Sequence, residues 1–357
     1  MNSPTTQKLY EILNTHFGFQ SFRPYQEAVC KEATEGTDLL LVMPTGAGKS
    51  LCYQVPGLAR GGTTLVISPL LALIEDQVAK LQSQGLRAER IHSGRNREDS
   101  RKVCVDYLNG GLDFLFIAPE RLAVPGFLEL LARRKPSLIA IDEAHCISQW
   151  GHDFRPDYLR LHDAIAALGS NSERPQVIAL TATATPKVRD DIAAQLALNR
   201  PENFVAGFDR PNLALRVEPC KSDKERIAHA ARIAERSEGT GIIYASTRKA
   251  VEDVAAQLQA LGLKVAGYHA GLNDATRSRV QERFMSGQLQ AIVATNAFGM
   301  GVDKRDLRFV THYNLPGSVE AYYQEVGRAG RDGLPSVCTL LFNYVDTRTH
   351  EFFIDGS

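Results

Sequence analysis

The chain has 357 residues, 44% hydrophobic and 23% charged, which is typical of a globular protein and long enough for two α/β domains, each with its own core. Lysine plus arginine (41) equals aspartate plus glutamate (41), so the sequence has no overall positive field, and nucleic-acid binding would require a local groove. No run approaches the roughly 20 apolar residues of a membrane span, and the N-terminus lacks a secretory signal, so we expect a cytoplasmic protein without membrane contact.

The N-terminal part of the chain has the pattern of a parallel α/β domain. Residues 5–35 alternate helical stretches with the loop FGFQSFRPYQ. Apolar runs that end in small or polar residues follow: LLLVMP (39–44), TTLVISP (63–69), LDFLFIAP (112–119), LIAIDEAH (138–145) and PQVIALTATA (175–184). Continuous apolar strands separated by helices predict a parallel sheet covered on both faces. Functional residues in such sheets gather at the carboxyl ends of the strands.

A second series of the same kind begins near residue 208. Its predicted strands are GTGIIYAS (239–246), LKVAGYHA (263–270), LQAIVATN (289–296), LRFVTHYN (307–314) and SVCTLLFN (336–343). Helices are predicted at 248–262 and 274–287, and residues 204–217 are interpreted as the linker. We therefore expect two tandem domains, residues 1–207 and 208–345, followed by a tail at 346–357.

The six cysteines are Cys30, Cys52, Cys104, Cys146, Cys220 and Cys338. They form no C-x-x-C pair and no Cys/His cluster at zinc spacing. We therefore expect buried, reduced thiols and no structural zinc.

The segment MPTGAGKS (43–50) matches the phosphate-binding loop, except that Met43 replaces the leading glycine. Thr45, Gly46 and Gly48 lie in the loop, where glycines let backbone amides curl around phosphate oxygens. Lys49 is expected to reach the β- and γ-phosphates, and the Ser50 hydroxyl to bind Mg²⁺. The alternative is a glycine-rich turn without this role.

Two adjacent carboxylates close the predicted strand LIAI. Asp142 lies at a strand end in the domain that carries the phosphate-binding loop, where a Mg²⁺ partner is expected. Glu143 follows it and is a candidate general base for an attacking water. Alone, such residues could also form an ordinary strand-to-loop turn.

Together these segments resemble the superfamily 2 helicases, and in finer detail the RecQ family. The resemblance covers residues 9–343 and is carried by FGFQSFRPYQ, MPTGAGKSLCYQ, SPLLALIEDQ (68–77), IAPERL, DEAHCISQWGHDFRPDY (142–158), LTATAT, FDRPN, YHAGL, ATNAFGMGVDK (294–304) and YYQEVGRAGRDGLP (322–335). The segment after DEAH and the GRAGRDG run are the most specific. The resemblance implies two RecA-like domains of the P-loop NTPase type, with mostly parallel sheets flanked by helices.

The resemblance assigns the base of the nucleotide to residues near the N-terminus. It implies that Gln26 reads the adenine edge and that Arg23 and Phe19 bracket the ring. Phe19 often corresponds to tyrosine in relatives; stacking survives that change, but a hydroxyl hydrogen bond does not. For Phe19 the alternative is an aromatic residue that anchors the N-terminal helix.

The resemblance also places Trp150, Asp153, Phe154 and Arg155 in an aromatic-rich loop that senses single-stranded DNA and couples it to hydrolysis. Aromatic rings stack on bases with about 1–3 kcal/mol each, and arginine contacts phosphate. Tryptophan and phenylalanine are otherwise more often core residues, yet the polarity of this segment favours an exposed loop.

In the second domain the resemblance implies that Arg328 and Arg331 reach the γ-phosphate and that Gln324 contacts nucleotide or water. It implies that Asp303, in AFGMGVDK with Gly299 and Gly301, links the site to the DNA track.

Hydroxyl residues at strand ends are candidate contacts to the nucleic-acid backbone, or ordinary helix caps. They are Thr181, Thr183, Ser68 with Pro69, and Ser246 with Thr247.

These inferences predict a monomeric, nucleoid-associated motor that uses ATP and Mg²⁺ to translocate 3′ to 5′ on single-stranded DNA and to unwind tailed duplexes in repair and recombination. One alternative is a nucleotide-gated module that binds or translocates on single-stranded DNA without unwinding, and another is an RNA helicase of DEAD/DEAH type. Relatives continue into a four-cysteine zinc module and a winged-helix domain, and we expect residues 346–357 to begin that further region.

Overall fold

The computed structural model describes residues 3–151, 153–169, 174–207, 209–296, 298 and 304–347. The chain divides into two units between residues 208 and 209. We call them the first and the second unit. Within the described ranges, no helix combines the length and apolar character needed to cross a membrane.

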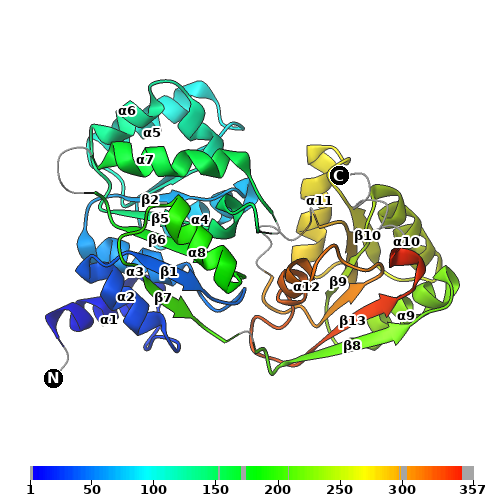
Figure 1. Cartoon of the computed structure of the whole chain (residues 1–357). Coiled ribbons are helices and arrows are strands. Elements are labelled where there is room, and N and C mark those ends of the chain that lie inside the picture. Colours follow the sequence, from blue (N-terminus) through cyan, green and yellow to red (C-terminus); the bar gives the residue numbers. More distant parts are fainter. Residues whose placement is uncertain are drawn as a thin grey trace. The chain divides into compact units, whose positions relative to one another are not determined.

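A parallel sheet of seven strands forms the centre of the first unit, with helices on both faces (Figure 1). The strand order is β3-β4-β2-β5-β6-β1-β7, and every neighbouring pair is parallel. The strands are β1 (Leu39–Val42), β2 (Thr64–Ile67), β3 (Ala88–Ile91), β4 (Phe114–Ile117), β5 (Leu138–Ile141), β6 (Val177–Thr181) and β7 (Glu202–Val205). The helices are α1 (Pro4–Phe17), α2 (Gln26–Glu35), α3 (Leu51–Arg60), α4 (Leu71–Ser83), α5 (Arg97–Leu108), α6 (Phe127–Ala132), α7 (Leu161–Leu168) and α8 (Pro186–Gln195), with 3-10 turns η1 (Pro119–Ala123), η2 (Ala144–Ile147) and η3 (Pro156–Arg160).

The second unit repeats this architecture with six parallel strands in the order β10-β11-β9-β12-β13-β8 (Figure 1). Its strands are β8 (Leu213–Pro219), β9 (Gly241–Tyr244), β10 (Val265–Tyr268), β11 (Ala291–Ala294), β12 (Phe309–His312) and β13 (Ser336–Phe342). Its helices are α9 (Asp223–Arg236), α10 (Arg248–Ala260), α11 (Asp274–Met285) and α12 (Val319–Val326). The predicted α/β class with parallel sheets is therefore confirmed for both units.

Strands β1 and β9 are buried at every position because both faces of each sheet are covered. In β1, Leu39 and Leu41 belong to one buried cluster and Leu40 to the cluster on the opposite face. In β9, Ile242 and Ile243 divide in the same way between the two clusters of the second unit. Burial on both faces removes the alternation of polar and apolar residues that marks a half-exposed strand.

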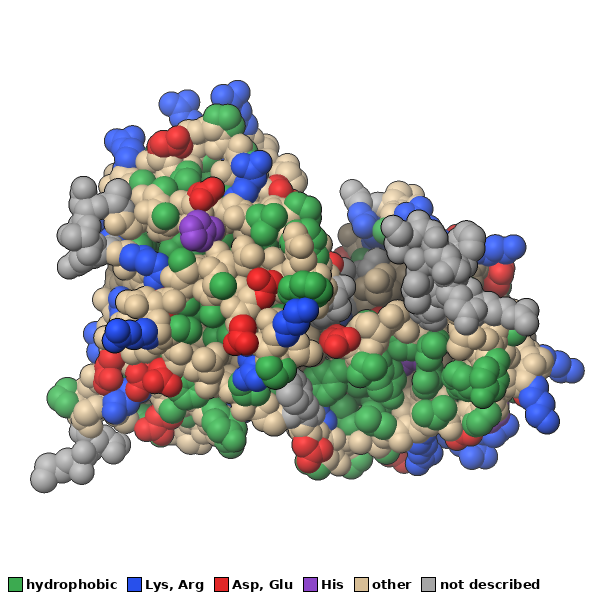
Figure 2. All heavy atoms as spheres, viewed as in Figure 1, with side chains coloured by type: hydrophobic (Ala, Val, Ile, Leu, Met, Phe, Trp, Pro, Cys, Tyr) green, Lys and Arg blue, Asp and Glu red, His purple; other side chains and the backbone are tan. Residues whose placement is uncertain are grey.

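The sequence patterns missed three strands, and all three lie at sheet edges. These strands are β3, β7 and β8. The prediction of a linker at 204–217 is wrong, because this range includes the end of β7 and most of β8. An edge strand is paired on one side only, and Leu215 and Val217 of β8 remain 59% and 61% exposed. Figure 2 shows hydrophobic side chains gathered over β8 and β13. Without a continuous buried run, such strands resemble loops in a sequence.

All six cysteines lie within the described ranges, and none forms a disulfide there. Five are buried, as expected, whereas Cys104 is only partly buried.

Candidate functional site

The loop between β1 and α3 has the backbone shape that a phosphate cradle requires. Gly46 and Gly48 adopt φ values of 81° and 87°, which side-chain-bearing residues rarely adopt. A Cβ atom on Gly48 would also lie 2.5 Å from Gln26 Nε2, so the close approach of that side chain requires glycine. Ser50 is the N-cap of α3, whose N-terminus favours an anion. Residues 45–50, which include Thr45, are all partly exposed and therefore open to a ligand.

Lys49 folds back over this loop. Its Nζ donates a hydrogen bond to the Met43 carbonyl over 3.0 Å. Burial and the charge of Glu143 raise the pKa of Asp142, the carboxylate after β5, and the Lys49 ammonium opposes part of this rise. The structure thus brings together Lys49 and Asp142, which lie on opposite sides of β6 in the sheet order.

Two of the three residues predicted to hold the nucleotide base contact the phosphate-binding loop itself. Gln26 is 1% exposed, and its Nε2 donates to the carbonyls of Ala47 (3.3 Å) and Gly48 (3.1 Å). Arg23 donates to the Gly46 carbonyl over 2.8 Å, while its backbone N–H donates to Gln26 Oε1 over 2.9 Å. These bonds set the position of the loop against the start of α2.

The aromatic residues beside them are exposed. Phe19 follows the C-cap of α1 and is 42% exposed. Tyr25 is 55% exposed and takes a left-handed φ of 69° immediately before Gln26. No role was predicted for Tyr25, because the sequence shows an aromatic residue in the FGFQSFRPYQ loop but not its strained backbone conformation.

The acidic pair lies at the carboxyl end of β5. Asp142 Oδ2 accepts a hydrogen bond from the Ser68 hydroxyl over 3.3 Å, and its backbone carbonyl accepts one from the Tyr158 hydroxyl over 2.8 Å. Burial, together with the negative charge of Glu143, raises the pKa of Asp142 to about 7. A divalent cation would oppose both effects and favour the ionised carboxylate, so this donor set fits Mg²⁺.

Glu143 is held in an unusual conformation. Its φ of 48° and ψ of 46° lie in the left-handed region, which is energetically unfavourable for a residue with a side chain such as glutamate. Its Oε2 atom is buried and receives no hydrogen bond from the residues that the structure describes. His145 Nδ1 lies 3.3 Å from this oxygen, without the alignment of a hydrogen bond. The strain and the open lone pairs are features expected of a reacting carboxylate.

A buried hydroxyl chain links this acidic pair to β6. His145 Nδ1 lies 2.9 Å from Thr181 Oγ1, and the Thr181 hydroxyl donates to the Thr183 carbonyl over 3.1 Å. This direction requires the histidine to donate from Nδ1. Thr181 is fully buried, so its hydroxyl acts inside the protein; the Thr183 hydroxyl has no described partner.

In the aromatic-rich loop, of which residues 148–151 and 153–155 are described, Arg155 forms an ion pair with Asp153. Arg155 donates to Asp153 Oδ2 from Nε (3.1 Å) and Nη2 (2.9 Å). Its Nη1 donates to the Pro69 carbonyl over 3.4 Å. Since Ser68 bonds Asp142, the segment after β2 contacts both the acidic pair and the loop.

The two aromatic side chains of this loop differ in exposure. Trp150 is 63% exposed, and Phe154 is partly buried. Lys187 Nζ lies 3.1 Å from the centroid of the Trp150 ring. The predicted exposure of the loop is therefore observed for Trp150 and only in part for Phe154.

Tertiary folding also gathers three groups with metal-ligating atoms, which the cysteine spacing did not indicate. Ligand atoms of His145, Cys146 and Asp153 all lie within 4.8 Å of one another. Burial, together with the charge of Asp153, raises the pKa of the Cys146 thiol. The Asp153 carboxylate accepts a hydrogen bond from Arg155. In this arrangement the three groups join the DEAH segment to the aromatic-rich loop.

In the second unit the predicted arginines lie in a turn at residues 327–334, the arginine turn, which follows α12. Arg328 is 8% exposed and Arg331 partly exposed, while Gln324 lies on α12. Burial raises the pKa of Tyr244 to about 12, although the neighbouring Arg328 opposes that shift.

The arginine turn is held by residues to which the sequence reasoning gave no role. Arg210 donates to the carbonyls of Gly327 (3.3 Å), Ala329 (2.9 Å) and Gly330 (3.0 Å). Asn212 donates to Gly330 (2.9 Å) and Leu334 (3.0 Å). Both belong to the FDRPN segment, so this motif was visible, but its distant contact was not.

The remaining predicted positions of the second unit are two hydroxyl residues after β9 and the residues of the AFGMGVDK segment. Thr247 accepts a hydrogen bond from Ala250 N over 3.1 Å and thus caps α10, and the Ser246 backbone N–H donates to Asn314. Asp303, Gly299 and Gly301 lie outside the described residues.

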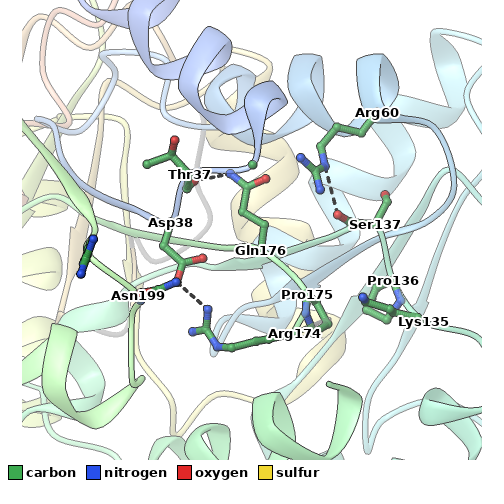
Figure 3. A pocket seen from close by; sticks show the side chains of 12 residues that line it. Thr37, Asp38, Arg60, Lys135, Pro136, Ser137, Arg174, Pro175, Gln176 and Asn199 are labelled. Atoms are coloured by element: carbon green, nitrogen blue, oxygen red, sulfur yellow. Dashed lines mark hydrogen bonds and ion pairs between the residues drawn. The ribbon is translucent and has the colours of Figure 1, made fainter. Parts of the chain in front are cut away.

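A cavity of about 820 Å³ lies at the amino-terminal ends of β1, β5 and β6 (Figure 3). Four cationic residues line it, namely Arg60, Lys135, Arg174 and Arg200. Arg174 is paired with Asp38, and Arg60 donates to the carbonyls of Ser137, Ala33 and Thr34. The phosphate-binding loop and the acidic pair follow β1 and β5, so this cavity is separate from the candidate site.

Comparisons with known proteins agree with this geometry. The profile of DEAD/DEAH box helicases matches residues 23–192, and that of the helicase conserved C-terminal domain matches residues 224–333. The chain is 43% identical over 352 residues to the ATP-dependent DNA helicase RecQ of Haemophilus influenzae, covering 97% of this chain and 56% of that protein. It is 44% identical over 336 residues to the probable ATP-dependent DNA helicase RecS of Bacillus subtilis, covering 94% of this chain and 66% of that protein.

Similarity extends to solved structures at lower identity. The Mycobacterium smegmatis helicase Lhr bound to single-stranded DNA and AMP-PNP superposes with a TM-score of 0.76 at 19% identity, over 99% of this chain and 49% of that one. This match confirms the fold expected of two RecA-like domains. The chain spans about half the length of the curated RecQ relatives that it matches. Its motifs, its two parallel sheets and its identity to RecQ proteins along nearly all its length agree: the chain belongs to the RecQ family of helicases.

Proposed function

We propose that this chain is the ATP-driven motor core of a DNA helicase that moves 3′ to 5′ on single-stranded DNA and separates tailed duplexes. The observation that carries the proposal is the convergence of Lys49 and Ser50 with Asp142 and Glu143 at the carboxyl ends of two strands in one sheet. The relatives named ATP-dependent DNA helicases support DNA as the track.

In this proposal the phosphate-binding loop holds the phosphates of ATP. The backbone of residues 45–50 curls through Gly46 and Gly48 to offer amide donors, and Lys49 exchanges the Met43 carbonyl for the β- and γ-phosphates. Ser50 and Asp142 would hold Mg²⁺, which would neutralise negative charge on the phosphates. Gln26, Arg23 and Phe19 would contact the adenine.

Glu143 is proposed as the residue that orients and deprotonates the attacking water. Its Oε2 atom receives no hydrogen bond from the described residues, so its lone pairs can accept one from water. The left-handed backbone directs the side chain away from the regular path of the strand. His145, 3.3 Å away, limits the positions that this oxygen can adopt.

Arg328 and Arg331 are proposed to supply positive charge to the γ-phosphate, with Gln324 contacting nucleotide or water. Charge spread over a transferring phosphoryl group is stabilised by such cations. The rigid support of the turn by Arg210 and Asn212 favours this role, because preorganised charges need no reorganisation during the reaction.

Single-stranded DNA is proposed to contact the aromatic-rich loop. The exposed ring of Trp150 can stack on a base, and Phe154 and Arg155 can add apolar and phosphate contacts. Asp153 would then exchange Arg155 for other partners as DNA binds, and Asp303 is proposed to couple the DNA track to the nucleotide site.

The test is steady-state ATP hydrolysis with and without single-stranded DNA or RNA, followed by unwinding of 3′- and 5′-tailed duplexes. We expect stimulation by DNA and not by RNA, and unwinding of the 3′-tailed substrate. Equal stimulation by RNA would favour the RNA helicase instead. DNA-stimulated hydrolysis without unwinding would indicate a translocase or nucleotide-gated binding module.

A further inference from the structure

The exposed tryptophan of the aromatic-rich loop has one covered face. Lys187 Nζ lies 3.1 Å from the centroid of the Trp150 ring, although 63% of the tryptophan surface remains exposed. An ammonium group over an indole face is attracted by the negative potential of the ring, most strongly for tryptophan. A base can therefore stack without obstruction only on the other face.

Lys187 belongs to helix α8, which is held in place by its N-cap and by packing. Lys187 lies in the first turn of α8, where the Thr185 hydroxyl caps the helix by accepting from Val188 N over 3.4 Å. Helix α8 packs against η2, from which the loop departs. The Lys187 side chain thus connects the aromatic-rich loop to α8, the helix that follows β6 and its Thr181, which contacts His145.

We propose that Lys187 is a positioning residue for nucleic-acid binding, which holds the Trp150 ring with one face closed and the opposite face open to a single base. This inference rests on the proposed DNA-binding function. A cation–π contact at an exposed ring changes an equilibrium by about 2- to 5-fold, whereas stacking on a base is worth roughly 5- to 150-fold. Lys187 therefore sets the orientation of the ring, and the base provides most of the affinity.

Trp150 is the only tryptophan among the 357 residues, so tryptophan fluorescence, excited at a wavelength that the 11 tyrosines do not absorb, reports on this ring alone. In the free protein, Lys187→Ala should raise the acrylamide quenching constant about 1.5- to 2-fold, because the second face becomes accessible. Lys187→Arg should retain the protection, since a guanidinium stacks on indole equally well. Lys135→Ala, which removes an exposed cation at the amino-terminal end of β5, is the matched control. Equal quenching of wild-type and Lys187→Ala proteins would overturn the inference.

Binding separates this role from a direct phosphate contact. With oligo-dT, Lys187→Ala should raise the DNA concentration for half-maximal ATPase about 2- to 5-fold, with the rate at saturating DNA unchanged, and Lys187→Arg should restore it. In a Trp150→Leu background, Lys187→Ala should have no further effect. A persisting effect in that background, with a salt slope about one unit shallower, would instead identify a phosphate contact and contradict the inference. Circular dichroism and thermal unfolding establish that each variant is folded.

The quenching measurement needs neither ATP nor DNA. A protein whose ATPase ignores DNA would refute the proposed function, whatever the quenching shows. An unprotected tryptophan in a DNA-stimulated ATPase would refute only the role of Lys187.

Discussion

The phosphate-binding loop and the arginine turn are both glycine-containing motifs, but they are shaped in different ways. The loop after β1 is fixed by its own glycines and by Gln26 and Arg23, which lie 21 to 23 residues away in the chain. The arginine turn is held by Arg210 and Asn212, which lie 117 to 122 residues away. One motif is thus determined mostly by local sequence, and the other depends on a distant support.

The largest effect is expected at Lys49 in the locally determined loop. Lys49→Ala should reduce DNA-stimulated ATP hydrolysis by at least about 100-fold, because the charge on the phosphates loses its main partner. Thermal stability should change by no more than about 1 kcal/mol, since the hydrogen bond from Lys49 Nζ to the Met43 carbonyl is only partly buried. Substantial hydrolysis by this variant would show that the assigned nucleotide site is wrong.

A glycine in the distantly supported turn should matter for stability as well as activity. Gly330 has φ 55°, and a Cβ atom there would lie 2.4 Å from Asn212 Nδ2 and 2.8 Å from the Leu334 carbonyl. Gly330→Ala should therefore destabilise the protein by about 2–4 kcal/mol and lower ATPase activity, measured by urea unfolding and steady-state kinetics. Gly333→Ala is the matched control, because its φ of 85° costs about 1 kcal/mol but its Cβ would meet nothing within 4 Å. Equal costs at the two positions would argue against support by Asn212.

The acidic pair predicts an opposition between stability and activity. The pKa of Asp142 is raised from 3.8 to about 7. Between these values the folded protein retains a proton that the unfolded chain has lost, so stability falls as pH rises through this window. Asp142→Asn removes the titrating group and with it this fall in stability. The variant should be more stable than the wild-type protein by about 1–2 kcal/mol at pH 8 without metal, and it should not hydrolyse ATP.

Thermal unfolding at pH 5 and pH 8, with EDTA or Mg²⁺, checks this expectation. Mg²⁺ should narrow the difference in stability between the wild-type protein and Asp142→Asn at pH 8, because a bound cation favours the ionised carboxylate. If Asp142→Asn were less stable at both pH values, the carboxylate would be favourable in the folded state, contrary to the predicted sign.

The smallest effects distinguish two neighbouring threonines. Thr181→Val should cost about 1–2 kcal/mol, because it leaves His145 Nδ1 without its 2.9 Å partner. Thr183→Val should change stability by no more than about 0.5 kcal/mol, because the hydroxyl has no described partner to lose. A loss of DNA affinity in Thr183→Val, at unchanged stability, would support a phosphate contact by that hydroxyl.

The sequence alone predicted the parallel α/β class, the central strands, and the strand ends that carry Lys49, Ser50, Asp142 and Glu143. It could do so because central strands are buried on both faces and give continuous apolar runs, and because a phosphate-binding loop requires glycines at set positions in one short segment. It predicted less where a strand or side chain depends on a single remote neighbour. Three of the four edge strands (β3, β7 and β8), the partial burial of Phe154 and the internal use of the Thr181 hydroxyl are of this kind.

Only the tertiary structure decided which groups meet across the chain. It brought Arg210 to the arginine turn, Lys187 to the ring of Trp150, and His145 with Cys146 to Asp153. The physical reason is that motif patterns record what a local backbone requires, whereas side-chain pairing depends on which helix packs beside which strand. Local sequence therefore determined the chemistry available at each strand end, and packing determined the partners that position it.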